Sequence, residues 1–313
     1  EIARVCASTA ITMAAHTSLG MTPIYLVGSE KQKRKYIPPL ASGEMIGAFG
    51  LTEASAGSDA AATKTTAVKK GDEWIINGSK VFTTNAGVAG VISITAKVIE
   101  NDEEKGIGAF IIETDNPGLR IGPKEKKMGW NASDTRQIFF EDLRVSDEQR
   151  LGESVDGFRT FLRALVGGRI SVGALSCGTA EGAYSAALKY SHEREAFGKR
   201  IHKFQSVGFK LADMATEIEA SKLLVYQAAK KYDEGHNVVK EAAMAKLFAS
   251  ETAMKTTTEA IQVFGGYGYI KEYPAERFFR DAKVLTIGEG TSEIQKIIIL
   301  REILKSLDNA ISV

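Results

Sequence analysis

The stretch FQSVGFKLADMATEIEASKLLVYQAAKKYDEG, residues 204–235, has the regular apolar spacing that decides the fold of the second half of the chain. Its apolar residues recur at four- and three-residue steps, with a longer gap before the last: Val207, Leu211, Met214, Ile218 and Val225. This spacing predicts one apolar face on an α-helix, and Gly235 is a typical residue at a helix end. Such a helix packs against other helices, so we predict a helical bundle here.

The helical pattern extends from about residue 152 to the end of the chain. EAAMAKLFASETAMKTTTEAIQVFGG, residues 241–266, predicts a second long helix that ends at Gly265-Gly266. No internal repeat or low-complexity segment interrupts this region.

The first 44 residues are also expected to be helical. EIARVCASTAITMAAHTSLG, residues 1–20, is rich in helix-forming residues and ends at a glycine. A short helix is expected to start at Ser29 and to stop at Pro38-Pro39, because proline removes a helical hydrogen bond.

Residues 45–150 are instead rich in β-branched and aromatic residues. Three runs predict strands: VISITAKVI, GAFIIET and RQIFFEDLRVS. In DEWIINGSKVFTTNA, residues 72–86, Asn77-Gly78 predicts the turn of a hairpin between two strands. Helices, a β module and then a helical bundle make an α+β layout.

Composition excludes several classes of protein. The 313 residues carry a formal net charge of +1, so no bulk field favours nucleic acid. Cys6 and Cys177, the two cysteines, lack the spacing of a zinc site and favour a reducing compartment. No apolar run reaches the ~18 residues of a membrane span. The chain starts without methionine, so a lost targeting segment remains open.

Two loop regions could bind an anionic or aromatic ligand. FGLTEASAGSDAA, residues 49–61, offers hydroxyl and backbone N–H donors, yet it would equally suit a plain surface loop. SHEREAFGKRIHKFQ, residues 191–205, gathers basic side chains that suit a pyrophosphate or a solvated connection between helices. His192 and His202 lack the partners of a metal site, and we expect no metal.

The segments near the C-terminus raise two further alternatives. In QVFGGYGYIKEYPAERFFRDAK, residues 262–283, the glycines either let a ligand approach the backbone or only end a helix. In VLTIGEGTSEIQKIII, residues 284–299, Glu289 stands between two glycines. It could be a desolvated general base or an acidic residue before a helix capped by Thr291 or Ser292.

Taken together, these motifs resemble the acyl-CoA dehydrogenase family over residues 1 to about 305. The resemblance depends on TEASAGSDAA, REAFGKRIHKFQ, IQVFGGYGYIKEYPAERFFRDAK and IGEGTSEIQ, which occur in order and at family-like spacing. It implies a remnant of an N-terminal helical domain at residues 1–44, a central β-barrel at 45–150 and a C-terminal four-helix bundle at 151–313.

The resemblance also implies the chemistry. Non-covalent FAD is expected between barrel and bundle, in a homotetramer without a membrane span. The expected reaction converts a short- or branched-chain acyl-CoA to the trans-2-enoyl-CoA: Glu289 removes the α-proton and flavin N5 accepts the β-hydride. Electrons are expected to pass to an electron-transferring flavoprotein. We expect a cytoplasmic location, or the mitochondrial matrix if the source is eukaryotic.

Matched motifs imply further site residues. The residues expected to contact FAD are Phe49, Leu51, Thr52, Gly57, Ser58, Phe82, Thr84, Arg194, Phe197, Gln205, Gln262, Gly265, Gly266, Thr291 and Glu293. Of these, Gln262, Gly265 and Gly266 are expected to reach FAD from a neighbouring subunit. The residues expected near the substrate are Ser58, Gly288, Gly290 and Arg169, the last at the CoA arm.

Departures from the family pattern bear on the substrate. Phe82 replaces a usual tryptophan, and Val166 replaces an aspartate that many members carry near the CoA arm. Gly288 replaces the tyrosine that often precedes the base, which predicts room for a branched or bulky short acyl chain. Ala10 stands where members that act on glutaryl-CoA carry arginine, so a dicarboxylate is not expected.

Two other functions remain open. In an acyl-CoA oxidase, oxygen would take the electrons, although oxidases are generally much longer chains. A non-catalytic paralogue could serve as an assembly partner, although the intact base position and flavin loops argue against it.

Overall fold

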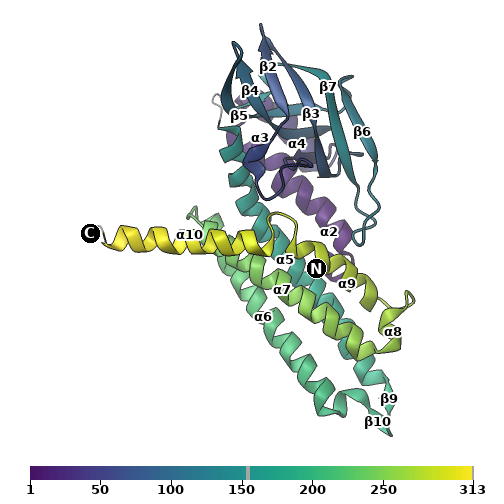
Figure 1. The fold of residues 1–313 in the computed structure, drawn as a ribbon. Helices are drawn as coiled ribbons and strands as arrows, with labels where there is room; N and C mark the ends of the chain where they lie inside the picture. Colours follow the sequence, from purple (N-terminus) through teal and green to yellow (C-terminus); the bar gives the residue numbers. More distant parts are fainter. Residues whose placement is uncertain (153–155, 312–313) are drawn as a thin grey trace. The chain divides into compact units, whose positions relative to one another are not determined.

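The computed structural model describes residues 1–152 and 156–311, and the chain forms two compact units (Figure 1). The helical unit comprises Glu1–Ile11, Lys127–Asn131 and Arg169–Val313. The sheet unit comprises Thr12–Lys126 and Ala132–Gly168. The division lies inside α5 (Gly157–Glu193), so the three domain boundaries expected from the sequence remain predictions.

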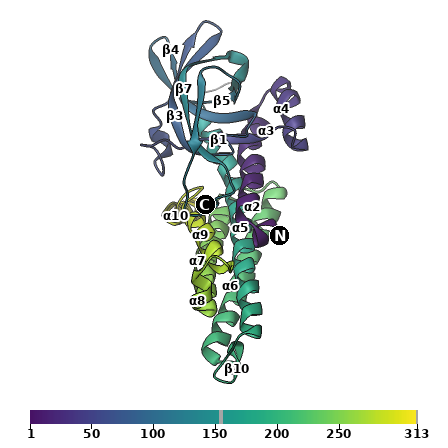
Figure 2. The ribbon, with the colours of Figure 1, turned by 90° about the vertical axis from the view of Figure 1, so that its right-hand side faces the viewer.

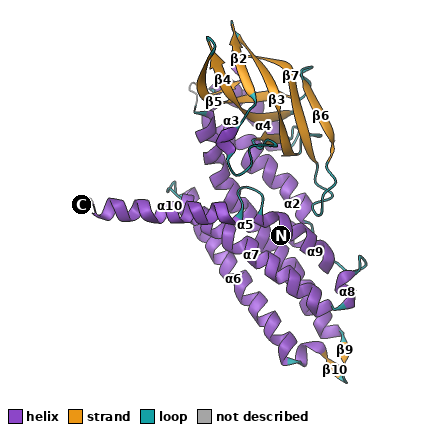
Figure 3. Cartoon of the chain, in the orientation of Figure 1, coloured by secondary structure: helices purple, strands orange, loops and turns teal. Residues whose placement is uncertain are grey.

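The sheet unit is built on one eight-stranded sheet (Figure 3). Its strands are β1 (Gly47–Gly50), β2 (Thr66–Lys70), β3 (Glu73–Thr84), β4 (Val91–Glu100), β5 (Glu103–Glu113), β6 (Leu119–Lys124), β7 (Thr135–Ser146) and β8 (Arg150–Leu151). The order is β6-β7-β3-β2-β4-β5-β8, and β1 pairs with β4 in parallel. Among the described residues no pairing joins β6 to β8, so the expected barrel is present as an open-ended sheet.

The sheet encloses an apolar core because its strands alternate inward and outward side chains. Trp74 and Ile76 on β3, Ile94 on β4 and Phe110 on β5 have no exposed surface. A second core lies under η1 (Ala15–Met21), α3 (Thr22–Val27) and α4 (Glu30–Ser42), where Ile24 and Leu40 are buried.

Two local predictions in this unit were wrong. The hairpin turn between β2 and β3 is at Gly71-Asp72, since Lys70 pairs with Glu73. Asn77-Gly78 is instead an irregularity inside β3, and the Asn77 amide bonds to Asp142 on β7. The Asn77 side chain, which could have stabilised a turn, therefore bonds across a bulge between β3 and β7.

The second error concerns α4, which continues through Pro38 and Pro39 to Ser42. Ser29 starts this helix with a capping box, as expected from its position. The prolines remove backbone donors, but burial of Tyr36 and Leu40 holds the last turns in place.

The helical unit is formed by long helices that share a core (Figures 1 and 2). Its elements are α1 (Ile2–Val5), α5, β9 (Glu195–Ala196), β10 (Lys199–Arg200), η4 (Ile201–Lys203), α6 (Gln205–Asp233), α7 (Val239–Phe264), α8 (Gly266–Tyr269), α9 (Ala275–Lys283), η5 (Val284–Thr286) and α10 (Ser292–Ile311). α2 (Ala7–Ala14) crosses the boundary of the two units. The remaining short elements are η2 (Ala60–Ala62) and η3 (Asp147–Gln149).

The apolar face expected on α6 is confirmed. Leu211, Met214, Ile218 and Val225 are all buried. Val225 packs with Ala245 and Ala249 of α7 and with Cys177 of α5. The α+β layout is therefore confirmed, and among the described residues no helix has the length and apolar character needed to cross a membrane.

Candidate active site

Glu289 lies in a tight turn between η5 and α10. Its φ is 53° and that of Gly290 is 95°, so two successive residues have left-handed backbone. For a residue with a side chain this conformation costs about 1–2 kcal/mol. Glycine is favoured at Gly290 because L side chains rarely adopt a φ of 95°, and a Cβ there would also displace Gln295 Nε2, 2.7 Å away.

Donors from two helices hold the carbonyl groups of this turn. Gln295 Nε2 donates to Glu289 O at 3.1 Å and to Gly290 O at 2.9 Å. Lys246 Nζ, from the middle of α7, donates to Gly290 O at 2.9 Å. These bonds fix the direction in which the Glu289 side chain leaves the backbone.

The Glu289 carboxyl group is desolvated and incompletely bonded. Although part of the residue reaches the surface, Oε2 is buried and has no hydrogen-bond partner among the described residues. Burial raises the pKa of Glu289 to about 7, while the positive charges of Arg169 and Lys246 act to lower it. A carboxyl group with these properties suits a general base near neutral pH.

Arg169 and Lys246 bring buried positive charge to this site. Arg169, on α5, is 6% exposed, and its Nε has no partner among the described residues. Burial lowers the pKa of Arg169, whereas the Glu289 charge raises it. The sequence led us to expect Arg169 at the CoA arm; the structure brings it within electrostatic reach of Glu289.

Lys246 and Gln295 were not predicted from the sequence as site residues. The available signal was a single lysine inside the alanine-rich run AAMAKLFAS, on the same helix face as the buried Ala242 and Ala249. Lysine is almost never fully buried unless it is paired, so its place on an apolar face was informative.

Thr291 and Glu293 were expected to contact FAD, and the structure gives Thr291 a local role. Its hydroxyl accepts a hydrogen bond from Ile294 N at 3.3 Å and so caps α10. Glu293 is exposed, and its pKa is lowered by its own backbone N–H and by the Thr291 hydroxyl. Gly288 is open on one side, because a Cβ there would meet only Val284 O, at 3.5 Å.

In the sheet unit, the loop after β1 is held by a buried ion pair. Lys80 Nζ on β3 lies 2.7 Å from Glu53 Oε1, and Glu53 also accepts bonds from Thr63, Lys64 and Thr65. Thr52 O accepts a hydrogen bond from Val81 N at 2.8 Å.

These bonds do not involve the middle of the loop, and the expected flavin contacts Gly57 and Ser58 are exposed there. Leu51 and Thr52, at the start of the loop, are partly buried. Phe49 stacks on Phe161 with 4.3 Å between ring centroids, so one face of its ring is already covered.

The end of β3 combines an exposed ring with buried polar atoms that lack partners. Phe82 has a φ of 56° and is 68% exposed. On either side of Thr84, Thr83 Oγ1 and Asn85 Oδ1 are buried without a hydrogen-bond partner among the described residues. Strained backbone, an open aromatic face and unsatisfied polar atoms are common at ligand sites.

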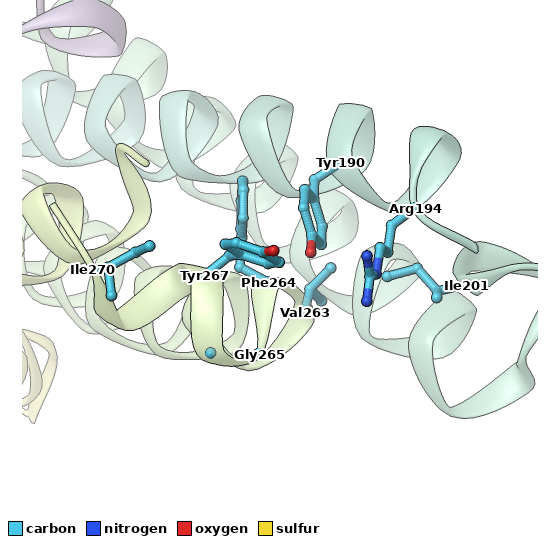
Figure 4. A pocket seen from close by; sticks show the side chains of 9 residues that line it. Tyr190, Arg194, Ile201, Val263, Phe264, Gly265, Tyr267 and Ile270 are labelled. Carbon is cyan, nitrogen blue, oxygen red and sulfur yellow. The ribbon is translucent and has the colours of Figure 1, made fainter. Parts of the chain in front are cut away.

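A pocket of about 420 Å³ lies in the helical unit (Figure 4). Arg194, Tyr190 and Tyr267 line it, together with the backbone of Gly265 and Gly266. No atom lies within 4 Å of a Cβ built at either glycine, so a ligand could approach the backbone there. Arg194 and the two glycines therefore line one pocket of the chain, and the expectation that Gly265 and Gly266 reach the FAD of a neighbouring subunit stays a prediction.

Three other expected cofactor contacts do not line this pocket. Phe197, at the tip of the β9–β10 hairpin, is 95% exposed with a φ of 49°. Gln205 and Gln262 are exposed at the start of α6 and near the end of α7.

These features fit FAD. The described chain presents exposed aromatic rings for stacking, a guanidinium for phosphate and open glycine backbone. Among the described residues, no group of His, Cys, Asp and Glu could hold a metal ion. Cys6 and Cys177 are free thiols.

Models of known protein families match the chain along most of its length. The family model for the acyl-CoA dehydrogenase N-terminal domain matches residues 1–44, the middle domain 48–143 and the C-terminal domain 155–304. A curated relative, probable acyl-CoA dehydrogenase YngJ of Bacillus subtilis, is 49% identical over 97% of this chain and 80% of its own.

Solved structures of related proteins show the same similarity. Butyryl-CoA dehydrogenase from Megasphaera elsdenii has a TM-score of 0.94 and 46% identity, covering 97% of this chain and 80% of its own. A chain from a study of the electron transferring flavoprotein of Acidaminococcus fermentans has the same TM-score and coverage with 50% identity.

Proposed function

The chain belongs to the acyl-CoA dehydrogenase family of FAD-dependent enzymes, and from that premise we propose that Glu289 is the base that removes the α-proton of a short- or branched-chain acyl-CoA. The observation that carries this proposal is the buried carboxyl group of Glu289, with Oε2 unpartnered and a pKa raised to about 7 by burial. When bound, FAD supplies the acceptor for the β-hydride, and the product is the trans-2-enoyl-CoA.

Glu289 is suited to this step in two ways. As a carboxylate near neutral pH it takes the proton, and its raised pKa makes it a stronger base than an exposed glutamate. Its backbone N–H is our candidate donor to the thioester carbonyl, where a hydrogen bond would stabilise the enolate charge that develops. The acyl chain would exclude water from the site and strengthen both effects.

We assign FAD to residues of each unit. In the sheet unit, the candidates are the β1 end and its loop (Phe49, Leu51, Thr52, Gly57, Ser58) and the β3 end (Phe82, Thr84). In the helical unit, Arg194 would meet the pyrophosphate and adenosine part, and Gly265 and Gly266, which line the same pocket of Figure 4, would reach FAD from a neighbouring subunit. Phe197, Gln205, Gln262, Thr291 and Glu293 remain proposed contacts.

We assign the substrate to residues beside the base and on the loop after β1. Gly288, Gly290 and Arg169 are on or near the Glu289 turn, and Ser58 is the candidate contact for CoA. The similarity to a butyryl-CoA dehydrogenase supports a short acyl chain. The open side of Gly288 supports tolerance of branching beside the α-carbon.

The electron acceptor and assembly follow by analogy. The similarity to a chain from an electron transferring flavoprotein study supports such a flavoprotein as the partner. We propose a homotetramer, and a cytoplasmic location or, in a eukaryote, the mitochondrial matrix. Oxygen as acceptor, as in an oxidase, is the alternative, and admitting air to the substrate-reduced enzyme separates the two, because only an oxidase would be reoxidised rapidly by oxygen.

Anaerobic mixing with acyl-CoA tests the base and the substrate together. FAD-loaded protein would be mixed with butyryl-, isobutyryl-, 2-methylbutyryl- and isovaleryl-CoA while the flavin absorbance is followed, with Glu289→Gln as the matched variant. We expect fast bleaching with the wild type and very slow bleaching with the variant. Equal rates for both proteins would remove Glu289 from the role of base.

Gly288→Tyr tests the acyl pocket. We expect this variant to lose the branched substrates first, because the new ring would occupy the open side of the turn. The ratio of kcat/KM for isobutyryl-CoA to that for butyryl-CoA measures the effect. Equal loss of straight and branched substrates would contradict the assignment.

A further inference from the structure

Lys246 is buried in a place that fold stability alone explains poorly. It lies in the middle of α7 with no exposed surface, among small residues such as Ala242 and Ala249. Its Nζ donates to a neutral acceptor, Gly290 O, at 2.9 Å. Burying an ammonium costs several kcal/mol, and a carbonyl offsets less of that cost than a carboxylate does.

We propose that Lys246 is a positioning residue for the base: its ammonium group fixes the Glu289 turn through the Gly290 carbonyl and keeps a positive charge beside the Glu289 carboxyl group. This inference rests on the proposed role of Glu289. It assigns to α7 a part in proton abstraction although Lys246 itself does not contact the reacting atoms.

Lys246 acts first on the shape of the Glu289 turn. Left-handed backbone at a residue with a side chain persists only where surrounding contacts hold it. Lys246 and Gln295 both donate to Gly290 O at 2.9 Å, so the carbonyl beside the base is held from α7 and from α10. Gln295 is neutral and Lys246 is charged, which lets the two effects be separated.

Second, Lys246 acts through its charge. The groups that act on Glu289 are Arg169 on α5 and Lys246 on α7, and both favour the carboxylate. Those that act on Lys246 are Glu289, Glu251 on α7 and Glu293 on α10, which favour the ammonium, and Arg169, which opposes it. Burial nevertheless lowers the pKa of Lys246 to about 8. Lys246 is therefore mostly charged at the pH at which Glu289 is half ionised.

The test uses the FAD-loaded enzyme and three variants. Lys246→Met keeps an unbranched side chain, one heavy atom shorter, but removes charge and donor. Lys246→Arg keeps the charge, and Gln295→Met removes a neutral donor to the same carbonyl. For each, kcat/KM for butyryl-CoA is measured from pH 5.5 to 9.5. In parallel, the Glu289 carboxyl group is titrated by ¹³C NMR of glutamate-labelled protein, with its signal assigned by its loss in Glu289→Gln.

We expect only Lys246→Met to move the titration of Glu289. Loss of a neighbouring opposite charge raises a carboxyl pKa by on the order of one unit or more. At pH 6, kcat/KM should therefore fall about tenfold, because one pKa unit is a tenfold change in ionisation. Above about pH 8 the two profiles should differ only by a pH-independent factor like that of Gln295→Met, since Lys246 then loses its charge in the wild type as well, while the variant lacks the donor to Gly290 O at every pH.

The controls separate charge from shape. Gln295→Met should lower kcat at all pH values without moving the Glu289 titration, and Lys246→Arg should keep the wild-type titration. If Lys246→Met yields no FAD-loaded protein, Lys246→Gln takes its place with the same expectation.

Two failures are distinguishable. An unchanged Glu289 titration and acidic limb in Lys246→Met would overturn the proposal for Lys246 while leaving Glu289 as the base. Full activity of Glu289→Gln would overturn the proposed function itself.

Discussion

Lys80 in the sheet unit and Lys246 in the helical unit are both fully buried, and each acts on a glutamate, but the two glutamates have opposite properties. Lys80 Nζ is 2.7 Å from Glu53, which accepts further bonds from Thr63, Lys64 and Thr65. Although burial acts to raise it, these bonds lower the pKa of Glu53 to about 2.

In the helical unit the lysine bonds to the backbone instead. Lys246 donates to Gly290 O, and Glu289 Oε2 is left without a partner among the described residues. The pKa of Glu289 is accordingly raised to about 7. The two pKa values differ because of hydrogen bonding to the carboxylate, more than because of burial or a nearby cation, since both glutamates are buried beside a lysine.

The largest expected difference between the two glutamates is in catalysis. Glu289→Gln should lower kcat by about 10²–10⁴-fold, the usual contribution of a general base. Glu53→Gln should instead change the amount of FAD-loaded protein, because Glu53 holds a loop. Single-turnover flavin reduction per bound FAD measures the first effect, and a similar loss in both variants would abolish the distinction.

The next effect is on the free energy of unfolding, and here the larger change is expected at the Lys80–Glu53 pair. Lys80→Met leaves Glu53 as a buried charge without its cation, and breaking a buried pair in this way costs about 3–5 kcal/mol. Urea unfolding measures the free energy. The double variant Lys80→Met/Glu53→Leu should recover much of that loss, because apolar residues can replace a buried pair. A double variant no better than the single one would show that the pair itself is not the source.

The pH dependence of stability should run in opposite directions for the two glutamates. The pKa of Glu53 is depressed from 4.5 to about 2, so its stabilisation is present above pH 4.5 and is lost as the pH falls toward 2. The pKa of Glu289 is raised from 4.5 to about 7, so its contribution is complete below pH 4.5 and is lost as the pH rises through 7.

Glu289→Gln should therefore stabilise the protein at pH 8 by up to about 3 kcal/mol and should have little effect at pH 4.5. Thermal unfolding of variant and wild type at both pH values checks this sign. A Tm rise of the same size at both values would mean that the carboxylate charge is not the cause.

The smallest effect concerns the helix caps beside the two sites. Thr291→Ala removes the cap of α10 and should cost about 1 kcal/mol, as should the matched Ser29→Ala at the start of α4 in the sheet unit. Urea unfolding of both variants measures the loss in the free energy of unfolding at each cap. An extra cost at Thr291 would indicate that the cap also supports the strained turn.

The sequence predicted those parts of the fold that depend on local periodicity. The apolar face of α6 and the end of α7 at Gly265 follow from spacing and helix-end chemistry. The hairpin turn predicted at Asn77-Gly78 was wrong because the same dipeptide can form a bulge inside a strand. The Asn77 side chain then bonds to Asp142 on β7. Pro38 and Pro39 misled because tertiary burial around Leu40 outweighs two lost helical bonds.

For the site, the motif around Glu289 could be recognised, but its electrostatics could not. The charges that act on Glu289 come from Arg169 and Lys246, which are 120 and 43 positions away along the chain. No linear spacing indicates that helices α5 and α7 bring them together. The sequence allowed a desolvated base at Glu289, but whether burial outweighs the lowering effect of these distant charges on the pKa depends on the folded structure.

The left-handed backbone of Glu289 also bears on how such a protein would evolve. A glycine at this position would relieve the strained φ of 53° and remove the buried carboxyl group. One base change in the codon converts glutamate to glycine, and selection for folding alone would favour it. With Glu289 as the proposed base, an inactive descendant that keeps the fold would be one mutation away, and only selection for the reaction would keep Glu289 in place.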